Sequence, residues 1–287
     1  NWKHFAHRWG DFENKYIIVD WQEVWPYDGI WSIIYSKDSK KLAYSVDKDD
    51  ESFIIMNWLK WKTFEHTYEL TFSPDSKSFS YAAKEDWKIF IEKDWISWKK
   101  YDSINSLKYS PDSKSFSYVA VDNWKEFVVK DWVEWKIYEG ISRESLTYYD
   151  NNKLAFIAKQ NWEYFLVKDW EEKETFERIS NLNYIVKTWS FSYVAKENWK
   201  EFFILNWEKS KKYDSIYSFT YSKDYKNYAF VGLKNWKYIL IKNWEEITKK
   251  GAYQKISLLK FSPDWESFSY HVRKEWKSFF INDEKIS

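Results

Sequence analysis

An aromatic residue recurs along the chain at an almost constant interval, and this repeat limits the possible fold more than any other feature. From Tyr44 to Tyr270, the residue numbers of successive copies differ by 37, 37, 38, 37, 37 and 40. Phe5 precedes Tyr44 by a similar interval and is also aromatic, so we assign it to the same repeat position. The sequence therefore predicts eight copies of one supersecondary unit, each stacked on its neighbours. The other seven copies are Tyr44, Tyr81, Tyr118, Phe156, Tyr193, Phe230 and Tyr270.

Each unit contains four short strand patterns. In the copy that begins at Ile104, turns separate the segments 104–110, 115–120, 126–130 and 133–139. In the second segment, Phe116 and Tyr118 alternate with serines, so that large side chains on one face can pack against small ones on the next sheet. Short strands with regularly spaced turns indicate an all-β protein, and four strands in a repeat of roughly 40 residues favour a propeller. We therefore predict an all-β β-propeller with four-stranded antiparallel blades.

The chain ends determine how many blades we expect. Residues 4–8, 14–20 and 22–28 supply second, third and fourth strands, and residues 256–261, 267–273 and 277–282 supply first, second and third strands. The hairpin of second and third strands thus occurs eight times, and the first strand seven times. We favour eight blades, with an incomplete one made from the two ends; seven blades plus a flanking hairpin is the alternative. We expect residues 1–287 to form a single β-propeller domain, and because Asn1 is neither an initiator methionine nor part of a signal peptide, the chain looks like a processed or truncated piece.

The turn between first and second strands carries Ser-Pro-Asp in three copies. Proline presets φ at the first central turn position, and Asp tolerates the second. We assign structural turn roles to Pro74, Asp75, Pro111, Asp112, Pro263 and Asp264.

The segments FSPDSKSFSY (72–81), YSPDSKSFSYVA (109–120) and FSPDWESFSY (261–270) resemble the strand–turn–strand core of TolB-type, WD-like propeller repeats. The resemblance extends over nearly the whole chain and is more specific for the fold than for function. It implies protein–protein interaction, often in the bacterial cell envelope or as a secreted protein.

Tryptophan occupies the turn positions where hairpins normally use glycine. The chain has 22 Trp and only 5 Gly, and 14 of the Trp residues follow Asn or Asp. Asn-Gly and Asp-Gly make strong hairpin turns because Gly accepts positive φ, whereas the left-handed conformation costs other residues about 1–2 kcal/mol. Trp265 is the clearest case, because it stands in SPDWES where the propeller family has Gly.

Two explanations compete for these tryptophans. In the first explanation, the indoles are real and form an exposed aromatic surface that stacks on sugar rings or on a partner protein. Alternatively, the positions are glycine in the source organism, because some bacterial lineages read UGA as glycine and others read it as tryptophan. We favour UGA recoding, because it explains the Gly deficit, the Trp excess and the Asn or Asp neighbours together.

Several function classes find no support in the sequence. The 45 basic and 44 acidic residues give a net charge of +1 and no footprint for nucleic acid. There is no Cys, and no apolar stretch approaches the roughly 18 residues of a membrane span. Metal-ligand spacings, nucleophile elbows and phosphate-binding glycine loops are also missing from the sequence, so we expect no metal, no cofactor and no enzyme activity.

Residues that depart from the repeat are the candidates for binding. Only four Arg and four His occur in the chain. Counted from Phe5 and Tyr270, Arg8 and Arg273 take the same repeat position, and a histidine lies close to each. Ring closure would bring the first and last second-strands into neighbouring blades. We therefore predict a cluster that binds an anion or a partner carboxylate, made of His7, Arg8, His271 and Arg273.

The sequence favours a non-catalytic propeller scaffold that binds a protein or peptide partner and acts as a monomer. A carbohydrate-binding, lectin-like propeller is the alternative, and it needs the turn tryptophans to be real. A hydrolase with two carboxylates in its central channel is less favoured, because the recurring Asp94, Asp131 and Asp169 lie in regular turns. The sequence does not fix the compartment.

Overall fold

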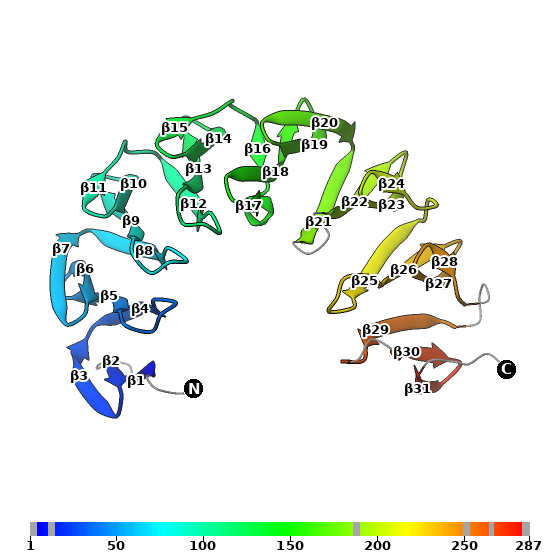
Figure 1. Ribbon diagram of the computed structural model, residues 1–287, viewed down its shortest axis with the longest axis horizontal. Helices are drawn as coiled ribbons and strands as arrows, with labels where there is room; N and C mark the ends of the chain where they lie inside the picture. Colours follow the sequence, from blue (N-terminus) through cyan, green and yellow to red (C-terminus); the bar gives the residue numbers. More distant parts are fainter. Residues whose placement is uncertain (1–4, 11–14, 186–189, 249–252, 264–266, 283–287) are drawn as a thin grey trace. The chain divides into compact units, whose positions relative to one another are not determined.

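The structure is a computed structural model that describes residues 5–10, 15–185, 190–248, 253–263 and 267–282. These residues form 31 β-strands and one short 3₁₀ helix, η1 (Arg143–Ser145). The strands make eight antiparallel sheets, which we number I to VIII in chain order (Figure 1). This confirms the predicted all-β architecture and its eight repeated sheets.

Sheets I to IV follow one another from the N-terminal side. Sheet I contains β1 (Ala6–Gly10), β2 (Lys15–Val19) and β3 (Gln22–Tyr27). Sheet II contains β4 (Gly29–Tyr35), β5 (Leu42–Lys48), β6 (Glu51–Met56) and β7 (Leu59–Phe64). Sheet III contains β8 (His66–Phe72), β9 (Phe79–Glu85), β10 (Lys88–Lys93) and β11 (Ile96–Ser97). Sheet IV contains β12 (Ser103–Tyr109), β13 (Phe116–Asp122), β14 (Lys125–Lys130) and β15 (Val133–Glu134).

Sheets V to VIII complete the described chain. Sheet V contains β16 (Gly140–Ile141), β17 (Thr147–Asp150), β18 (Lys153–Gln160), β19 (Glu163–Lys168) and β20 (Glu171–Phe176). Sheet VI contains β21 (Arg178–Ile185), β22 (Ser190–Glu197), β23 (Lys200–Leu205) and β24 (Glu208–Lys209). Sheet VII contains β25 (Ser215–Tyr221), β26 (Tyr228–Lys234), β27 (Lys237–Lys242) and β28 (Glu245–Glu246), and sheet VIII contains β29 (Lys255–Phe261), β30 (Phe268–Lys274) and β31 (Lys277–Asn282).

The chain divides into two compact units. One comprises residues 1–160 and 168–170, and the other comprises residues 161–167 and 171–287. Sheets I to IV belong to the first unit, sheets VI to VIII belong to the second, and the boundary passes through sheet V. That residues 1–287 form a single domain stays a prediction.

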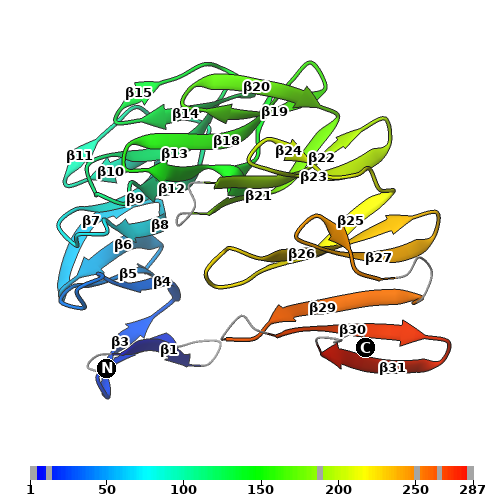
Figure 2. The ribbon, with the colours of Figure 1, turned by 45° about the vertical axis from the view of Figure 1, so that its right-hand side comes forward.

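Apolar cores join neighbouring sheets within each unit. In the first unit, one core joins sheets I and II through Ile17, Ile30 and Tyr44. Further cores join sheets II and III, and sheets III and IV. In the second unit, a core that includes Phe203 and Phe230 joins sheets VI and VII, whose hairpins are seen in Figure 2. Stacking of sheets, rather than any single sheet, therefore buries the aromatic residues of the repeat.

The second strand of the repeat is buried on both of its faces. In β13, all residues from Phe116 to Ala120 are buried, and the serine between the two aromatics is completely inaccessible. Tyr118 and Ala120 pack in the core shared with sheet III. Successive side chains of a strand point to opposite faces, so Val119 must point the other way. The small serine leaves room for the adjacent sheet, as the alternation predicts.

Two-residue turns close most of the hairpins, and both of their residues have positive φ. Between β13 and β14, Asn123 has φ 52° and Trp124 has φ 63°. Twelve described Asn-Trp or Asp-Trp pairs share this geometry, with φ of 62–73° at tryptophan. Positive φ at both central residues defines the type I′ turn, which favours Asn-Gly and Asp-Gly. The tryptophans therefore stand in backbone positions that suit glycine.

The Ser-Pro-Asp turns are held by their own side chains. The Ser73 hydroxyl donates to Asp75 Oδ1 at 2.6 Å, and the Lys77 amide donates to the same oxygen at 3.1 Å. These two hydrogen bonds hold the pKa of Asp75 below its usual value, and Ser110 and Lys114 do the same for Asp112. Pro74 and Pro111 precede these carboxylates in the same turns, and Pro263 precedes Asp264.

The first of these turns also contacts the next one. The amide of Asp75 donates to Ser113 Oγ at 2.9 Å, and Ser113 has φ 65°. Asp264 and Trp265 lie outside the described residues, but Trp265 takes the repeat position of Ser76 and Ser113, which both have positive φ.

The hydrogen bonds of β1 correct the assignment of Phe5. The amide of Asp20 donates to Phe5 O at 3.1 Å, as the amide of Asp94 donates to Phe79 O at 3.0 Å. Phe5 is therefore the equivalent of Phe79, and His7 takes the repeat position of Tyr81. With this register, Arg8 is not the equivalent of Arg273. The error arose because we matched aromatic identity rather than the regular repeat interval.

Candidate functional site

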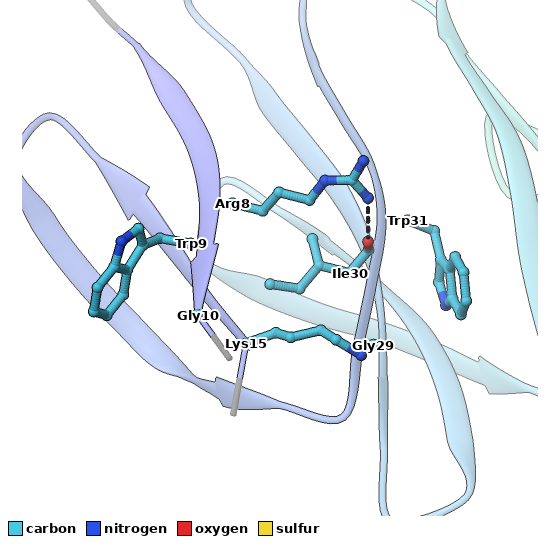
Figure 3. A pocket seen from close by; sticks show the side chains of 7 residues that line it. All are labelled: Arg8, Trp9, Gly10, Lys15, Gly29, Ile30 and Trp31. Carbon is cyan, nitrogen blue, oxygen red and sulfur yellow. Dashed lines mark hydrogen bonds between the residues drawn. The ribbon is translucent and has the colours of Figure 1, made fainter. Parts of the chain in front are cut away.

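A pocket opens in the first unit between the β1–β2 hairpin and the start of β4. It has a volume of about 310 Å³ and is lined by Arg8, Trp9, Gly10, Lys15, Gly29, Ile30 and Trp31. Figure 3 shows the Arg8 and Lys15 side chains running from their strands toward the beginning of β4. We call this the Arg8–Lys15 pocket. It has two cationic side chains and no carboxylate among its lining residues.

Both cations are anchored on the backbone that leads into sheet II. Arg8 Nη1 donates to Ile30 O at 3.0 Å, and Lys15 Nζ donates to Asp28 O at 2.7 Å. These bonds use one donor of each group, whereas a guanidinium has five and an ammonium three. Within the described ranges, neither cation forms an ion pair. Both groups therefore retain donors for a ligand.

The pocket has an indole toward each end (Figure 3). Trp31 Nε1 donates to Asp47 Oδ2 at 2.6 Å, which fixes that ring. Gly29 permits this arrangement, because a Cβ there would lie 3.1 Å from both Asp47 Oδ2 and Trp31 Nε1. Trp9 packs against Tyr16 with a ring-centroid separation of 6.2 Å. In Figure 3 both rings point away from the Arg8 and Lys15 side chains, so the indoles flank the pocket rather than face its charges.

The structure places the four predicted site residues in four different settings. Arg8 lines the pocket, but its neighbour His7 stacks on Phe5 at 5.8 Å and is not part of the lining. His271 contacts Ser257, with Nδ1 3.4 Å from Oγ, and packs against Phe280. Arg273 is exposed on the same strand. His7 and Arg8 belong to the first unit and His271 and Arg273 to the second, so their clustering stays a prediction.

Sequence reasoning missed Lys15, although a signal for it was available. Counted with the corrected register, Lys15 takes the repeat position of Glu126 and Glu201. This position is thus basic in sheet I and acidic in sheets IV and VI. The regular repeat interval, applied without the aromatic match at Phe5, reveals this difference.

The remaining polar groups belong mainly to repeated structural contacts. Lys88 Nζ lies 2.6 Å from Asp102 Oδ1, and Lys99 Nζ lies 2.7 Å from Glu134 Oε1. In the part of the chain that the structure describes, no group of three His, Cys, Asp or Glu residues could hold a metal ion. No helix among the described residues is long and apolar enough to cross a membrane.

Several indoles in each of the two units are strongly exposed. Trp124 is 95% exposed and Trp236 is 92% exposed. Other indoles stack in pairs between neighbouring sheets, such as Trp61 on Trp95 with centroids 3.2 Å apart. Soluble monomers rarely expose apolar surface on this scale, so these rings need an explanation.

Comparison with known proteins supports the fold and gives no family. No protein-family model matches the sequence, and no curated protein matches it significantly. Many solved structures resemble it, at low sequence identity. A putative dipeptidyl aminopeptidase IV from Bacteroides ovatus is 10% identical with a TM-score of 0.50; the match covers 93% of this chain and 55% of that one. The β-propeller domain of the Trilobed protease from Pyrococcus furiosus is 12% identical with a TM-score of 0.42, and the match covers 89% of this chain and 93% of that one.

A third similar structure, the Dos1 propeller, is 11% identical with a TM-score of 0.39 over 90% of this chain and 78% of that one. Likeness at this level concerns the fold alone. Eight successive antiparallel sheets of three to five strands, built from one repeat, make this chain a β-propeller.

Proposed function

We propose that this β-propeller is a non-catalytic scaffold that binds a protein or peptide partner. The Arg8–Lys15 pocket carries the proposal, because it lies where the chain departs from its own repeat. Elsewhere, carboxylates and lysines recur in turn bonds and ion pairs that hold the sheets together. Structural residues follow the repeat, whereas a binding site for one partner has to break it.

A selection from a random peptide library tests this proposal. We expect the chain to enrich peptides that lose binding when Arg8 is replaced by Gln. The matched control is Lys125→Gln, which removes one cation from an exposed position in sheet IV. Failure to enrich any peptide, together with turnover of peptide or glycoside substrates, would favour a hydrolase instead.

The TolB-type resemblance and UGA recoding remain part of this proposal. Twelve tryptophans with φ of 62–73° after Asn or Asp support glycine as the natural residue, because type I′ turns favour it. Mass spectrometry of peptides spanning 121–140, from protein isolated from its own source, distinguishes the two residues. Glycine masses at 124, 132 and 135 support recoding, and tryptophan masses contradict it.

A carbohydrate-binding propeller is the second candidate, and the exposed indoles favour it. Stacked pairs such as Trp135 on Trp170, with centroids 3.3 Å apart, would offer flat apolar faces to sugar rings. A glycan array probed with the chain that carries tryptophan at these positions tests this candidate. Binding that disappears when Trp124 and Trp236 are replaced by Gly would support it over the peptide scaffold.

A further inference from the structure

Two of the sheets, IV and VI, place a carboxylate of their own at the junction with the next sheet. Glu126 Oε2 accepts the amide hydrogen of Ile141 at 2.7 Å, and Glu201 Oε2 accepts that of Ile216 at 2.7 Å. In both cases the glutamate lies near the start of a third strand, and the isoleucine lies in the first strand of the following sheet. The fold can therefore hold a carboxylate at this junction, and it does so after sheets IV and VI.

Sheet I has the same junction with the opposite charge. Three full repeats separate Lys15 from Glu126, and the same interval separates Ile30 from Ile141. Arg8 takes the place of Val119, a residue with no exposed surface. The junction between sheets I and II thus has two cations where sheet IV has a carboxylate and an apolar side chain. Among the described residues, no carboxylate lines this pocket.

Among the described residues, two acidic side chains close to the pocket lining are hydrogen-bonded to groups other than the two cations. Asp28 Oδ2 accepts the amide hydrogen of Asp49 at 2.7 Å, and Asp47 Oδ2 accepts from Trp31 Nε1 at 2.6 Å. Neither residue belongs to the pocket lining. The positive charges of Arg8 and Lys15 are therefore not neutralised by a side chain of the described chain.

We propose that the Arg8–Lys15 pocket binds a carboxylate of the peptide partner, in the place where sheets IV and VI hold their own glutamate. This inference rests on the proposed scaffold function and specifies its ligand. A guanidinium fork matches a carboxylate in two parallel hydrogen bonds, and a lysine adds a point charge. A volume of about 310 Å³ lies at the small end of ligand pockets, which suits one or two residues rather than a long segment. Arg8 and Lys15 are present in the pocket whether positions 9 and 31 are Trp or Gly.

Defined peptides test the assignment directly. Fluorescein-labelled Gly-Gly-Ala-Ala with a free C-terminal carboxylate is compared with its C-terminal amide by fluorescence anisotropy. A third peptide, amidated and with Glu as its last residue, distinguishes a side-chain carboxylate from a terminal one. We expect one of the two carboxylate peptides to bind about tenfold or more tightly than the neutral amide, because hydrogen bonds to charged groups are the stronger ones.

Two variants complete the test. Lys15→Glu introduces the carboxylate that sheets IV and VI have at this position, and we expect it to abolish the preference for the charged peptides. Lys125→Glu makes the same change of charge in sheet IV and should leave the preference intact; thermal unfolding by circular dichroism checks that both variants fold. Each of three results would overturn the assignment. The acid and amide peptides bind equally, or the Lys15→Glu variant keeps the preference for the charged peptides. The third such result is that inorganic phosphate displaces the peptide as effectively as acetate does. Peptides enriched from the library that bind without any carboxylate preference would leave the scaffold function standing and remove only this ligand.

Discussion

The β1–β2 hairpin of sheet I and the β13–β14 hairpin of sheet IV share one register but carry different side chains. The pairs Ala6 with Val19 and Ser117 with Lys130 occupy equivalent positions in the two hairpins. Where sheet IV has Val119, Ala120 and Glu126, sheet I has Arg8, Trp9 and Lys15. The backbone is thus repeated while the chemistry at the junction is exchanged.

This difference separates what the fold requires from what it tolerates. Val119 and Ala120 point to opposite faces of β13, and neither has exposed surface, because both faces of this strand are buried. In β1, Arg8, Trp9 and Gly10 are exposed, so this strand accepts charge and bulk without burying them. A propeller built from identical sheets has a place for a specific binding site only where such a constraint is relaxed.

Exchanging the arginine and the valine should give the largest effect. We expect Val119→Arg to lower the free energy of unfolding by about 3–5 kcal/mol, because it buries a charge without a partner. Arg8→Val should change it by less than about 1 kcal/mol, because Arg8 is exposed. Urea unfolding followed by circular dichroism measures both. Similar losses in the two variants would show that the hairpins do not differ in burial as described.

Exchanging the glutamate and the lysine should have a smaller effect. Glu126→Lys removes the acceptor of the Ile141 amide, and we expect a loss of about 1–3 kcal/mol, the cost of an unsatisfied donor. Lys15→Glu should lose much less, because it places a carboxylate beside Arg8. The same unfolding measurement applies to both. A costly Lys15→Glu variant combined with a tolerated Glu126→Lys variant would reverse our interpretation of the junction.

The fold could be predicted from the sequence because it depends on local, repeated features. The aromatic interval and the Ser-Pro-Asp turns indicated four-stranded antiparallel sheets, and Asn or Asp before Trp indicated hairpins at the positions where the structure has type I′ turns. The pocket could not be predicted, because it depends on contacts between residues far apart in sequence, such as Arg8 with Ile30. Lys15 could have been identified from the repeat interval, but the match of Phe5 to Tyr44 put sheet I out of register by two residues.

The turn of the β13–β14 hairpin provides a test of moderate size. Trp124 has φ 63°, so we expect Trp124→Gly to raise the free energy of unfolding by about 1 kcal/mol through relief of left-handed strain. Trp135→Gly is the control, because Trp135 has no positive φ and its ring stacks on Trp170. That variant should gain nothing. Equal gains in both would mean that removing exposed rings, rather than turn strain, accounts for the effect.

The smallest expected effect concerns the pH dependence of the same turn. Asp102 Oδ2 accepts the amide hydrogen of Asn123 at 2.7 Å, and Lys88 Nζ lies 2.6 Å from Oδ1. The lysine first, and the Asn123 amide next, hold the pKa of this carboxyl below its usual value of 3.8. A lowered pKa in the folded state stabilises the protein above the unfolded pKa, and this stability is lost as the pH falls through the folded value. We therefore expect the amide resonance of Asn123 to titrate with a midpoint below 3.8, and the acid-side loss of stability to be shallower in Asp102→Asn. A midpoint at or above 3.8 for that resonance would mean that Asp102 does not hold this turn, and that the β13–β14 hairpin depends on its sheet contacts alone.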